Sequence, residues 1–226
     1  MKLMVVDTAL GLCTVGVFSV DGAAVYRLGL RSEPMVKGHS ERLAGFARDA
    51  ATEAGVAFTD LDRIGVTVGP GSFTGLRVGL AFAQGLAAAL NRPVVGISAL
   101  DALAASVPGA SRVAALIDAR RGQVYARFWG EDGPQGEPEA LMLDAASARI
   151  AGLGSGTVLV GSGAALFPGA GADLRVLDGP TAEALARLAA AADPALAPAR
   201  PLYLRAPDAT PPTRLPGQAR GPVRTP

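Results

Sequence analysis

The sequence predicts an α/β protein built from two copies of one unit, each a β-hairpin followed by a crossover to further strands. Short β-branched runs alternate with longer Ala-rich helical patterns, and a turn signal follows an early strand in each unit. The chain has 226 residues and is 50% hydrophobic, enough for one large core or two small ones. We expect a first half over 1–100, a second half over 101–206, and a flexible tail rich in proline and arginine over 207–226.

The first half is predicted to contain five strands and two helices. In order, these are strands over 3–7, 14–20 and 24–31, a helix over 40–54, a strand over 64–68, a helix over 76–90 and a strand over 93–98. Asp21-Gly22 is a strong two-residue signal for a hairpin turn. Ser40 can cap the first helix and Gly55 can end it. The last two strands are joined by a parallel crossover, so we expect cover on both faces of the sheet.

The second half repeats this pattern more weakly. In order, we expect strands over 113–118 and 123–129, a short helix over 144–150, a strand over 157–160 and a helix over 181–192. The turn of the second hairpin is Ala119-Arg120-Arg121-Gly122. Ligands in duplicated α/β folds gather at the carboxyl ends of strands, so a cleft between the two halves is expected there. For the tail, contact with RNA phosphates and an idle terminus both stay open, and the second is favoured.

The segment Gly69-Pro70-Gly71-Ser72-Phe73-Thr74-Gly75 is the most informative motif, because it joins a strand to the start of a helix. This arrangement presents backbone N–H groups to an anion, and Ser72 or Thr74 can cap the helix. No Gly-Lys-Ser/Thr follows, so this is not a Walker loop. The residues alone leave a ligand loop and a tight turn equally open. The candidate ligand or positioning residues are Asp7, Gly69, Gly71, Ser72, Asp118, Arg120 and Arg121.

Residues that could support catalysis are scarce. The single cysteine, Cys13, excludes an intrachain disulfide and a cysteine zinc cluster, and its neighbours suggest a packed thiol. The single histidine, His39, excludes a two-histidine metal site. We therefore predict no catalytic residue and no metal.

The net charge of +1 argues against an electropositive body. Asp7 comes too early for a signal peptide and the apolar run over 81–90 is too short for a membrane span, which predicts a cytoplasmic protein.

Both helices of the first half carry small and apolar residues on more than one face. Rows of small residues let helices approach closely, and a helix apolar on most sides is buried on most sides. Packing against the sheet accounts for at least one face, and we expect a partner on another. The residues predicted for this partner interface are Leu43, Phe46, Ala47, Ala50, Gly75, Leu76, Gly79, Phe82 and Ala83. Gly79→Leu is accordingly predicted to weaken association.

Four segments together resemble the bacterial TsaB family, formerly called YeaZ. They are residues 4–8, 37–43, 69–79 and 118–125, and the closing segment 201–205 is also similar. The resemblance implies an actin/Hsp70-like ATPase fold (ASKHA fold). It also implies a non-catalytic subunit in the formation of N6-threonylcarbamoyladenosine at position 37 of tRNAs that read codons beginning with A. The implied partners are a TsaD-like transferase, a TsaE-like P-loop ATPase, tRNA reached through the complex, and a second copy of the chain when it is alone.

The resemblance implies no cofactor on the isolated chain, with ATP or ADP expected at the interface of the complex. The first loop, residues 7–11, lacks the tight glycine of nucleotide-binding relatives, and residues 95–103 lack the metal-binding histidines of TsaD-like proteins. Two alternatives share the fold: a glycoprotease-like metallopeptidase (peptidase M22-like) and a small-molecule kinase. A peptidase needs a metal or a nucleophile with its base, and a kinase needs phosphate loops in both halves. Because the second half offers only Gly161-Ser162-Gly163, the scaffold interpretation is preferred.

Overall fold

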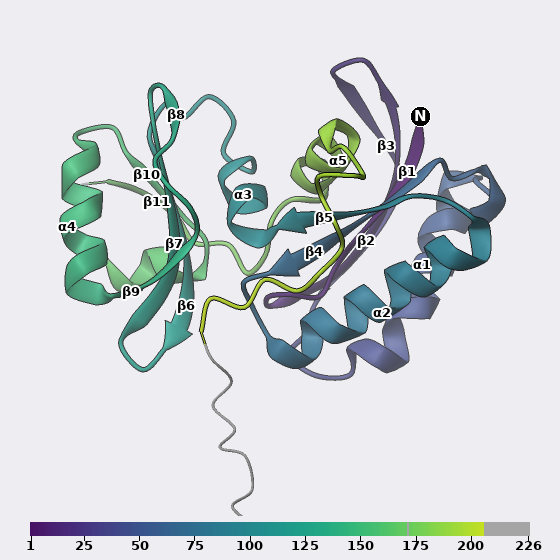
Figure 1. Cartoon of the computed structure of the whole chain (residues 1–226), viewed down its shortest axis with the longest axis horizontal. Helices are drawn as coiled ribbons and strands as arrows, with labels where there is room; N and C mark the ends of the chain where they lie inside the picture. Colours follow the sequence, from purple (N-terminus) through teal and green to yellow (C-terminus); the bar gives the residue numbers. More distant parts are fainter. Residues whose placement is uncertain (171, 206–226) are drawn as a thin grey trace, which may run out of the picture.

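The computed structural model describes residues 1–170 and 172–205, which form two sheets, each with helices against it (Figure 1). The first sheet has the strand order β3-β2-β1-β4-β5. Its strands are β1 (Lys2–Asp7), β2 (Leu12–Asp21), β3 (Ala24–Pro34), β4 (Arg63–Gly69) and β5 (Val94–Ser98). β2 pairs antiparallel with both β1 and β3, whereas β4 pairs parallel with both β1 and β5. The hairpin and the parallel crossover predicted for the first half are both confirmed.

The second sheet repeats this topology, with the order β11-β10-β6-β7-β8 and with β9 also pairing to β7. Its strands are β6 (Val113–Arg120), β7 (Gln123–Gly130), β8 (Gly133–Pro134), β9 (Glu139–Met142), β10 (Val158–Val160) and β11 (Asp173–Arg175). The hairpin β6–β7 corresponds to β1–β2, and the parallel strands β10 and β11 correspond to β4 and β5. The predicted duplication is therefore confirmed.

Helices cover the sheets in layers (Figure 1). They are α1 (His39–Ala54), α2 (Phe73–Leu90), α3 (Ala99–Ala104), α4 (Leu143–Leu153) and α5 (Ala182–Ala191), with short 3₁₀ turns η1 (Phe58–Asp60) and η2 (Ser162–Leu166). α1 and α2 pack on one face of the first sheet and α5 packs on the other, because the apolar residues of each strand alternate between the two faces. α3 packs between the two sheets and α4 covers the second sheet.

The helix ends follow their capping residues, with one difference from the prediction. Ser72 caps α2, its Oγ accepting a hydrogen bond from the Gly75 N–H at 3.2 Å, and Gly55 ends α1 in the left-handed conformation at φ 62°. Ser40 does not cap α1. The cap residue is Gly38, at φ 88°, and it makes no side-chain bond to the helix. Glycine is suited to this position because it has no Cβ to oppose a positive φ.

The C-terminal part of the second half returns to the first sheet. α5 packs on the first sheet, and the Arg63 guanidinium at the start of β4 donates to the carbonyl oxygens of Ala189 (2.8 Å), Ala190 (3.0 Å) and Ala192 (2.8 Å). The described part of the predicted second half, 101–170 and 172–205, is thus not a self-contained unit on the second sheet. The sequence also gave no sign of α3, which follows β5 directly and is too short for a helical period.

Within the described residues, α2 is the one helix long and apolar enough to cross a membrane by length and composition alone, with 18 residues and 33% of the window buried. The apolar run over 81–90, which was predicted to be too short for a membrane span, is part of a longer apolar helix that begins at Phe73. Its inner face forms part of the core of the first sheet. An apolar helix with one face in the core of its own sheet leaves its opposite face available for another protein.

Candidate functional site

A cleft of about 720 Å³ opens where the carboxyl ends of the strands of both halves meet. Its walls come from the loops after β1 and β4, from the end of β6, and from the last described residues. The lining residues are Ala9, Leu10, Gly11, Val36, Pro70, Gly71, Ser72, Phe73, Ile117, Asp118, Ala119, Arg120, Tyr125, Ser162, Asp178, Leu202, Tyr203, Leu204 and Arg205. The volume falls in the range of small-molecule sites, and the lining is mostly apolar with a few charged groups.

Asp7 organises the floor beneath this cleft but does not line it. Its side chain is fully buried, and its Oδ1 accepts hydrogen bonds from Thr67 Oγ1 at 2.6 Å and from the Ala9 N–H at 2.9 Å. Oδ2 has no hydrogen-bond partner among the described residues. Burial raises the pKa of Asp7 above its ordinary value, although the bonds from Thr67 and Ala9 oppose this. Asp7 therefore holds the first loop against β4.

The glycine-rich loop packs on that first loop. The Ser72 N–H donates to the Ala9 carbonyl oxygen at 2.7 Å. A Cβ at Gly71 would lie 2.2 Å from the Ala9 oxygen, and a Cβ at Gly75 would lie 2.0 Å from the Thr8 oxygen. These glycines are thus required by close approach of two backbones. The loops that cradle phosphate in nucleotide-binding proteins are here bonded to each other.

In the second half, the predicted residues form a constrained turn at the rim of the cleft. Arg120 and Arg121 adopt positive φ values of 63° and 54°, which are uncommon for residues with a Cβ. Asp118 supports the turn: its Oδ1 accepts from the Arg120 N–H at 2.8 Å, and its Oδ2 lies 3.2 Å from the Arg120 guanidinium. The Asp118 N–H donates to Ser162 Oγ at 3.2 Å, which ties the turn to the glycine loop after β10. The structure thereby brings Asp118 and Arg120 to the same cleft as Gly71 and Ser72.

The final described segment completes the mouth of the cleft. The Leu202 N–H donates to the Val68 carbonyl oxygen at 2.7 Å, and the Arg205 guanidinium donates to the Ala119 carbonyl oxygen at 3.2 Å. The segment therefore bridges the end of β4 and the second hairpin. It places Tyr203 beside Phe73, with ring centroids 5.6 Å apart. No sequence pattern pointed to this pair of rings, because their contact joins residues far apart in the chain.

The predicted partner-interface residues lie mostly inside the chain. Eight of the nine are buried against the first sheet or the first loop, namely Leu43, Phe46, Ala47, Ala50, Gly75, Leu76, Gly79 and Ala83. Phe82 is partly buried. A Cβ at Gly79 would lie 2.5 Å from Thr8 Oγ1, so this glycine is required by an internal contact. These eight residues are packed inside the chain, and Gly79 lies against Thr8.

The surface that α2 presents to solvent is formed by other small and apolar residues. Ala81, Gly85, Ala88 and Ala89 are exposed, and Val78, Phe82 and Leu86 flank them with partial exposure. A Cβ at Gly85 would meet no atom within 4 Å. We call these seven residues the outer face of α2. An exposed face of this composition is typical of a surface that another helix covers.

The two isolated reactive side chains are both buried. His39 begins α1 with 6% exposure, and its Nε2 has no hydrogen-bond partner among the described residues. Cys13 is packed in the first core, as predicted, and burial raises its pKa to about 11. Within residues 1–170 and 172–205, no three His, Cys, Asp or Glu side chains gather closely enough to hold a metal ion.

Comparison with known proteins agrees with this two-lobed ASKHA-type architecture. The family model for TsaD, described as tRNA N6-adenosine threonylcarbamoyltransferase, matches residues 26–133. YeaZ from Pseudomonas aeruginosa superimposes with a TM-score of 0.70 and 30% identity, over 90% of this chain and 99% of that one. A second P. aeruginosa structure, described as an uncharacterized protein with similarity to peptidase YEAZ, gives a TM-score of 0.74 at 30% identity. The expected ASKHA fold is confirmed.

Curated relatives point to one branch of this fold. The tRNA threonylcarbamoyladenosine biosynthesis protein TsaB of Escherichia coli K12 is 37% identical over 134 residues, which is 58% of this chain and 54% of the relative. The Haemophilus influenzae protein of the same name is 33% identical, with 52% of its length matched. The chain thus spans about half the length of these curated relatives. Together with the full-length match to YeaZ, these similarities show that the chain belongs to the TsaB/YeaZ family.

Proposed function

We propose that the chain is a non-catalytic subunit of the system that forms N6-threonylcarbamoyladenosine at position 37 of tRNA. The observation that carries the proposal is its membership of the TsaB/YeaZ family, whose E. coli member bears the name of this biosynthesis. A scaffold role accounts for a cleft whose phosphate-type loops bond to each other, and for a single histidine, His39, that is buried at the start of α1 and does not line the cleft. A cytoplasmic location without membrane contact belongs to the same proposal.

The proposed partner is a TsaD-type transferase that docks on the outer face of α2 and the neighbouring surface of α1. Supporting this, the match to the TsaD family model covers residues 26–133, the part of the chain that contains both helices. A partner with a related helix pair could complete a four-helix bundle, and small residues such as Gly85 would allow close approach. Without this partner, a second copy of the chain would take its place. A TsaE-like ATPase and tRNA would join through the complex.

We propose no cofactor for the isolated chain, and ATP or ADP at the interface of the complex. The mutual bonding of the first loop and the glycine-rich loop supports the first part, because Ser72 N–H already donates to Ala9. Nucleotide binding is measurable by isothermal titration calorimetry of the chain alone and of the complex. Binding of ATP by the isolated chain would overturn this assignment.

Reconstitution tests the proposed function. The chain, a TsaD-type transferase, a TsaE-type ATPase and an unmodified tRNA are mixed with the adenylate that donates the threonylcarbamoyl group, and each protein is then omitted in turn. We expect modification of the tRNA, measured by mass spectrometry of its nucleosides, to require the chain although the chain alone modifies nothing. Full modification in its absence would exclude the proposal, and so would steady peptide cleavage or ATP turnover by the chain alone.

A further inference from the structure

We propose that the mouth of the cleft contacts RNA directly, with unpaired bases stacking on the side chains of Tyr203, Phe73 and Arg77. This inference rests on the proposed function, and it assigns to this chain a direct contact with RNA. The expected ligand is a single-stranded loop of RNA. Its bases are recognised by planar side chains and its phosphates by basic residues at the rim.

The three side chains form one cluster on the surface, which we call the stack, because Phe73 contacts both Tyr203 and Arg77. The Phe73 and Tyr203 rings lie 5.6 Å apart with 37° between their planes, and the Arg77 guanidinium carbon lies 3.7 Å from the Phe73 ring centre. Phe73 and Tyr203 remain 45% and 44% exposed although both are large apolar groups. A planar cation on an aromatic ring leaves its outer face free to stack again, and bases stack on both aromatic rings and arginine planes.

The stack has a rigid support. Phe73 and Arg77 occupy positions i and i+4 on α2, so they share one face of that helix. The backbone next to Tyr203 is held by the bond from the Leu202 N–H to the Val68 carbonyl oxygen. Stacking on such a platform needs little ordering of side chains when a ligand binds.

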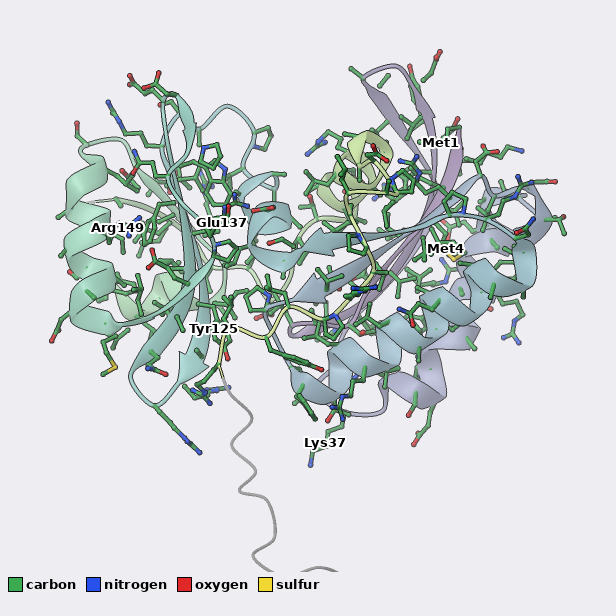
Figure 2. All side chains as sticks on the ribbon, in the orientation of Figure 1. Met1, Met4, Lys37, Tyr125, Glu137 and Arg149 are labelled. Atoms are coloured by element: carbon green, nitrogen blue, oxygen red, sulfur yellow. The ribbon has the colours of Figure 1, made fainter. Side chains whose placement is uncertain are left out.

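The charges around the stack favour a polyanion. Arg77 contacts the lining residue Phe73, the 85%-exposed Arg120 side chain stands at the rim, and Arg205 lines the cleft. Lys37 follows Val36, an 84%-exposed lining residue, and projects from the same edge of the molecule as the start of α2 (Figure 2). The lining carboxylates are Asp118, which is paired with Arg120, and Asp178. The described lining is thus balanced, with Arg120 and Arg205 against Asp118 and Asp178, and Arg77 and Lys37 add positive charge beside it.

The experiment measures RNA binding by the full chain and by its complex with the TsaD-type partner. The probe is a fluorescently labelled anticodon stem-loop RNA, followed by anisotropy at fixed low salt. We expect Phe73→Ala and Tyr203→Ala each to weaken binding by about 5- to 150-fold, the effect of losing one stacked base. Arg77→Lys keeps the charge but loses the planar group, and it should weaken binding as well. Tyr26→Ala is the matched control, since Tyr26 is 59% exposed on β3 and should leave binding unchanged.

Each other outcome contradicts the inference. Equal binding by all variants would exclude the stack, and wild-type binding by Arg77→Lys would reduce Arg77 to a charge contact. Loss of partner association in the Phe73 and Tyr203 variants would make this surface a protein interface. Competition by free AMP at the affinity of the RNA would make it a nucleotide site. Crosslinks from thiouridine-labelled RNA that avoid residues 73, 77 and 203 would place RNA elsewhere.

This test is separable from the test of the proposed function. If tRNA modification requires the chain but the stack variants bind RNA and modify it normally, the inference fails and the proposed function stands. If modification proceeds without the chain, the proposed function fails whatever the chain binds. Circular dichroism melting shows whether each variant is folded. We expect the Phe73 and Tyr203 variants to fold, because both side chains lie outside the buried core.

Discussion

Asp7 illustrates how one residue can keep its place in a fold while lying apart from the ligand site. It ends β1 next to the parallel strand β4, the position at which the sequence placed a candidate ligand residue. Its buried side chain accepts hydrogen bonds from Thr67 and Ala9, and it thereby holds the loop after β1 in place. The unpartnered Oδ2 makes its ionised form costly, because a buried charge without a full set of bonds loses hydration.

We predict that Asp7→Asn raises the thermal midpoint at neutral pH. The pKa of Asp7 is higher in the folded chain than its ordinary value of 3.8. Protonated Asp7 therefore makes its full contribution to the stability of the fold at pH values below 3.8. The contribution is lost as pH rises through the folded pKa. Asn cannot ionise and its Oδ1 can accept the same two bonds, so the gain should be present at pH 7 and shrink in acid. Each kcal/mol recovered corresponds to about 2–4 °C.

Differential scanning calorimetry from pH 4 to 8 checks this, with Asp21→Asn as a control on an exposed turn. A lower midpoint for Asp7→Asn at every pH would mean that the charge itself stabilises the loop.

The residues of the cleft were only partly predictable. Asp118, Arg120, Gly71 and Ser72 were found because strand-end positions and glycine motifs are local signals. Phe73, Arg77 and Tyr203 were assigned no shared role, since an exposed aromatic pair depends on how the chain's last described segment crosses β4. Such a contact between distant segments leaves no periodic trace in sequence.

At the scale of elements, the strands and helices of the first half could be located, but β8, β9, β11 and α3 were missed, and the direction of the helix faces could not be predicted. α2 is apolar around most of its circumference, so its hydrophobic pattern fails to separate the buried Gly79 from the exposed Gly85. The nearest atoms decide instead: a side chain at Gly79 would strike Thr8, and one at Gly85 would meet nothing. We therefore propose the outer face of α2 as the partner surface in place of the seam predicted at Gly79.

We predict that Gly85→Leu weakens association with the TsaD-type partner, or with a second copy of the chain, by about 5- to 150-fold. The added side chain would hold the two helix pairs apart, and overpacking of this kind costs about 1–3 kcal/mol. The fold itself should gain up to about 1 kcal/mol, since leucine favours helix over glycine. Analytical ultracentrifugation of the chain alone and with the partner measures the change.

Gly152→Leu is the matched control, because Gly152 lies on α4 and its added Cβ would also meet nothing within 4 Å. Gly79→Leu should instead lower the free energy of unfolding through its clash with Thr8. Unchanged association of folded Gly85→Leu would place the interface away from α2.

At the scale of the whole molecule, contacts distant in sequence tie the two halves together. α5 comes from the second half of the chain and covers the first sheet, and Arg63 holds its last turn through three carbonyl oxygens. A cation at a helix C-terminus also opposes the negative end of the helix dipole. The two repeats therefore share one stabilising layer.

Arg63→Met should accordingly lower the free energy of unfolding of the whole chain by about 1–3 kcal/mol, because three carbonyl groups lose a charged donor. Urea denaturation followed by circular dichroism provides the measurement. Arg92→Met serves as the comparison, since the exposed Arg92 makes one long bond, to the Thr59 oxygen at 3.4 Å, and should change stability by less than about 0.5 kcal/mol. Equal effects of the two substitutions would show that α5 docks without this clamp.

The crossovers of the two repeats are unequal, and this limits how the molecule can assemble. α2 spans 18 residues between β4 and β5, whereas the crossover from β10 to β11 is η2, with 5 residues. Within the described chain, the second repeat therefore has no long crossover helix to set beside α4. The outer face of α2 occurs once per chain, so it is fully covered once two chains pair through it. If the proposed pairing uses the outer face of α2 on one subunit and the matching face on the other, it ends at two subunits, like or unlike, and does not grow into a filament.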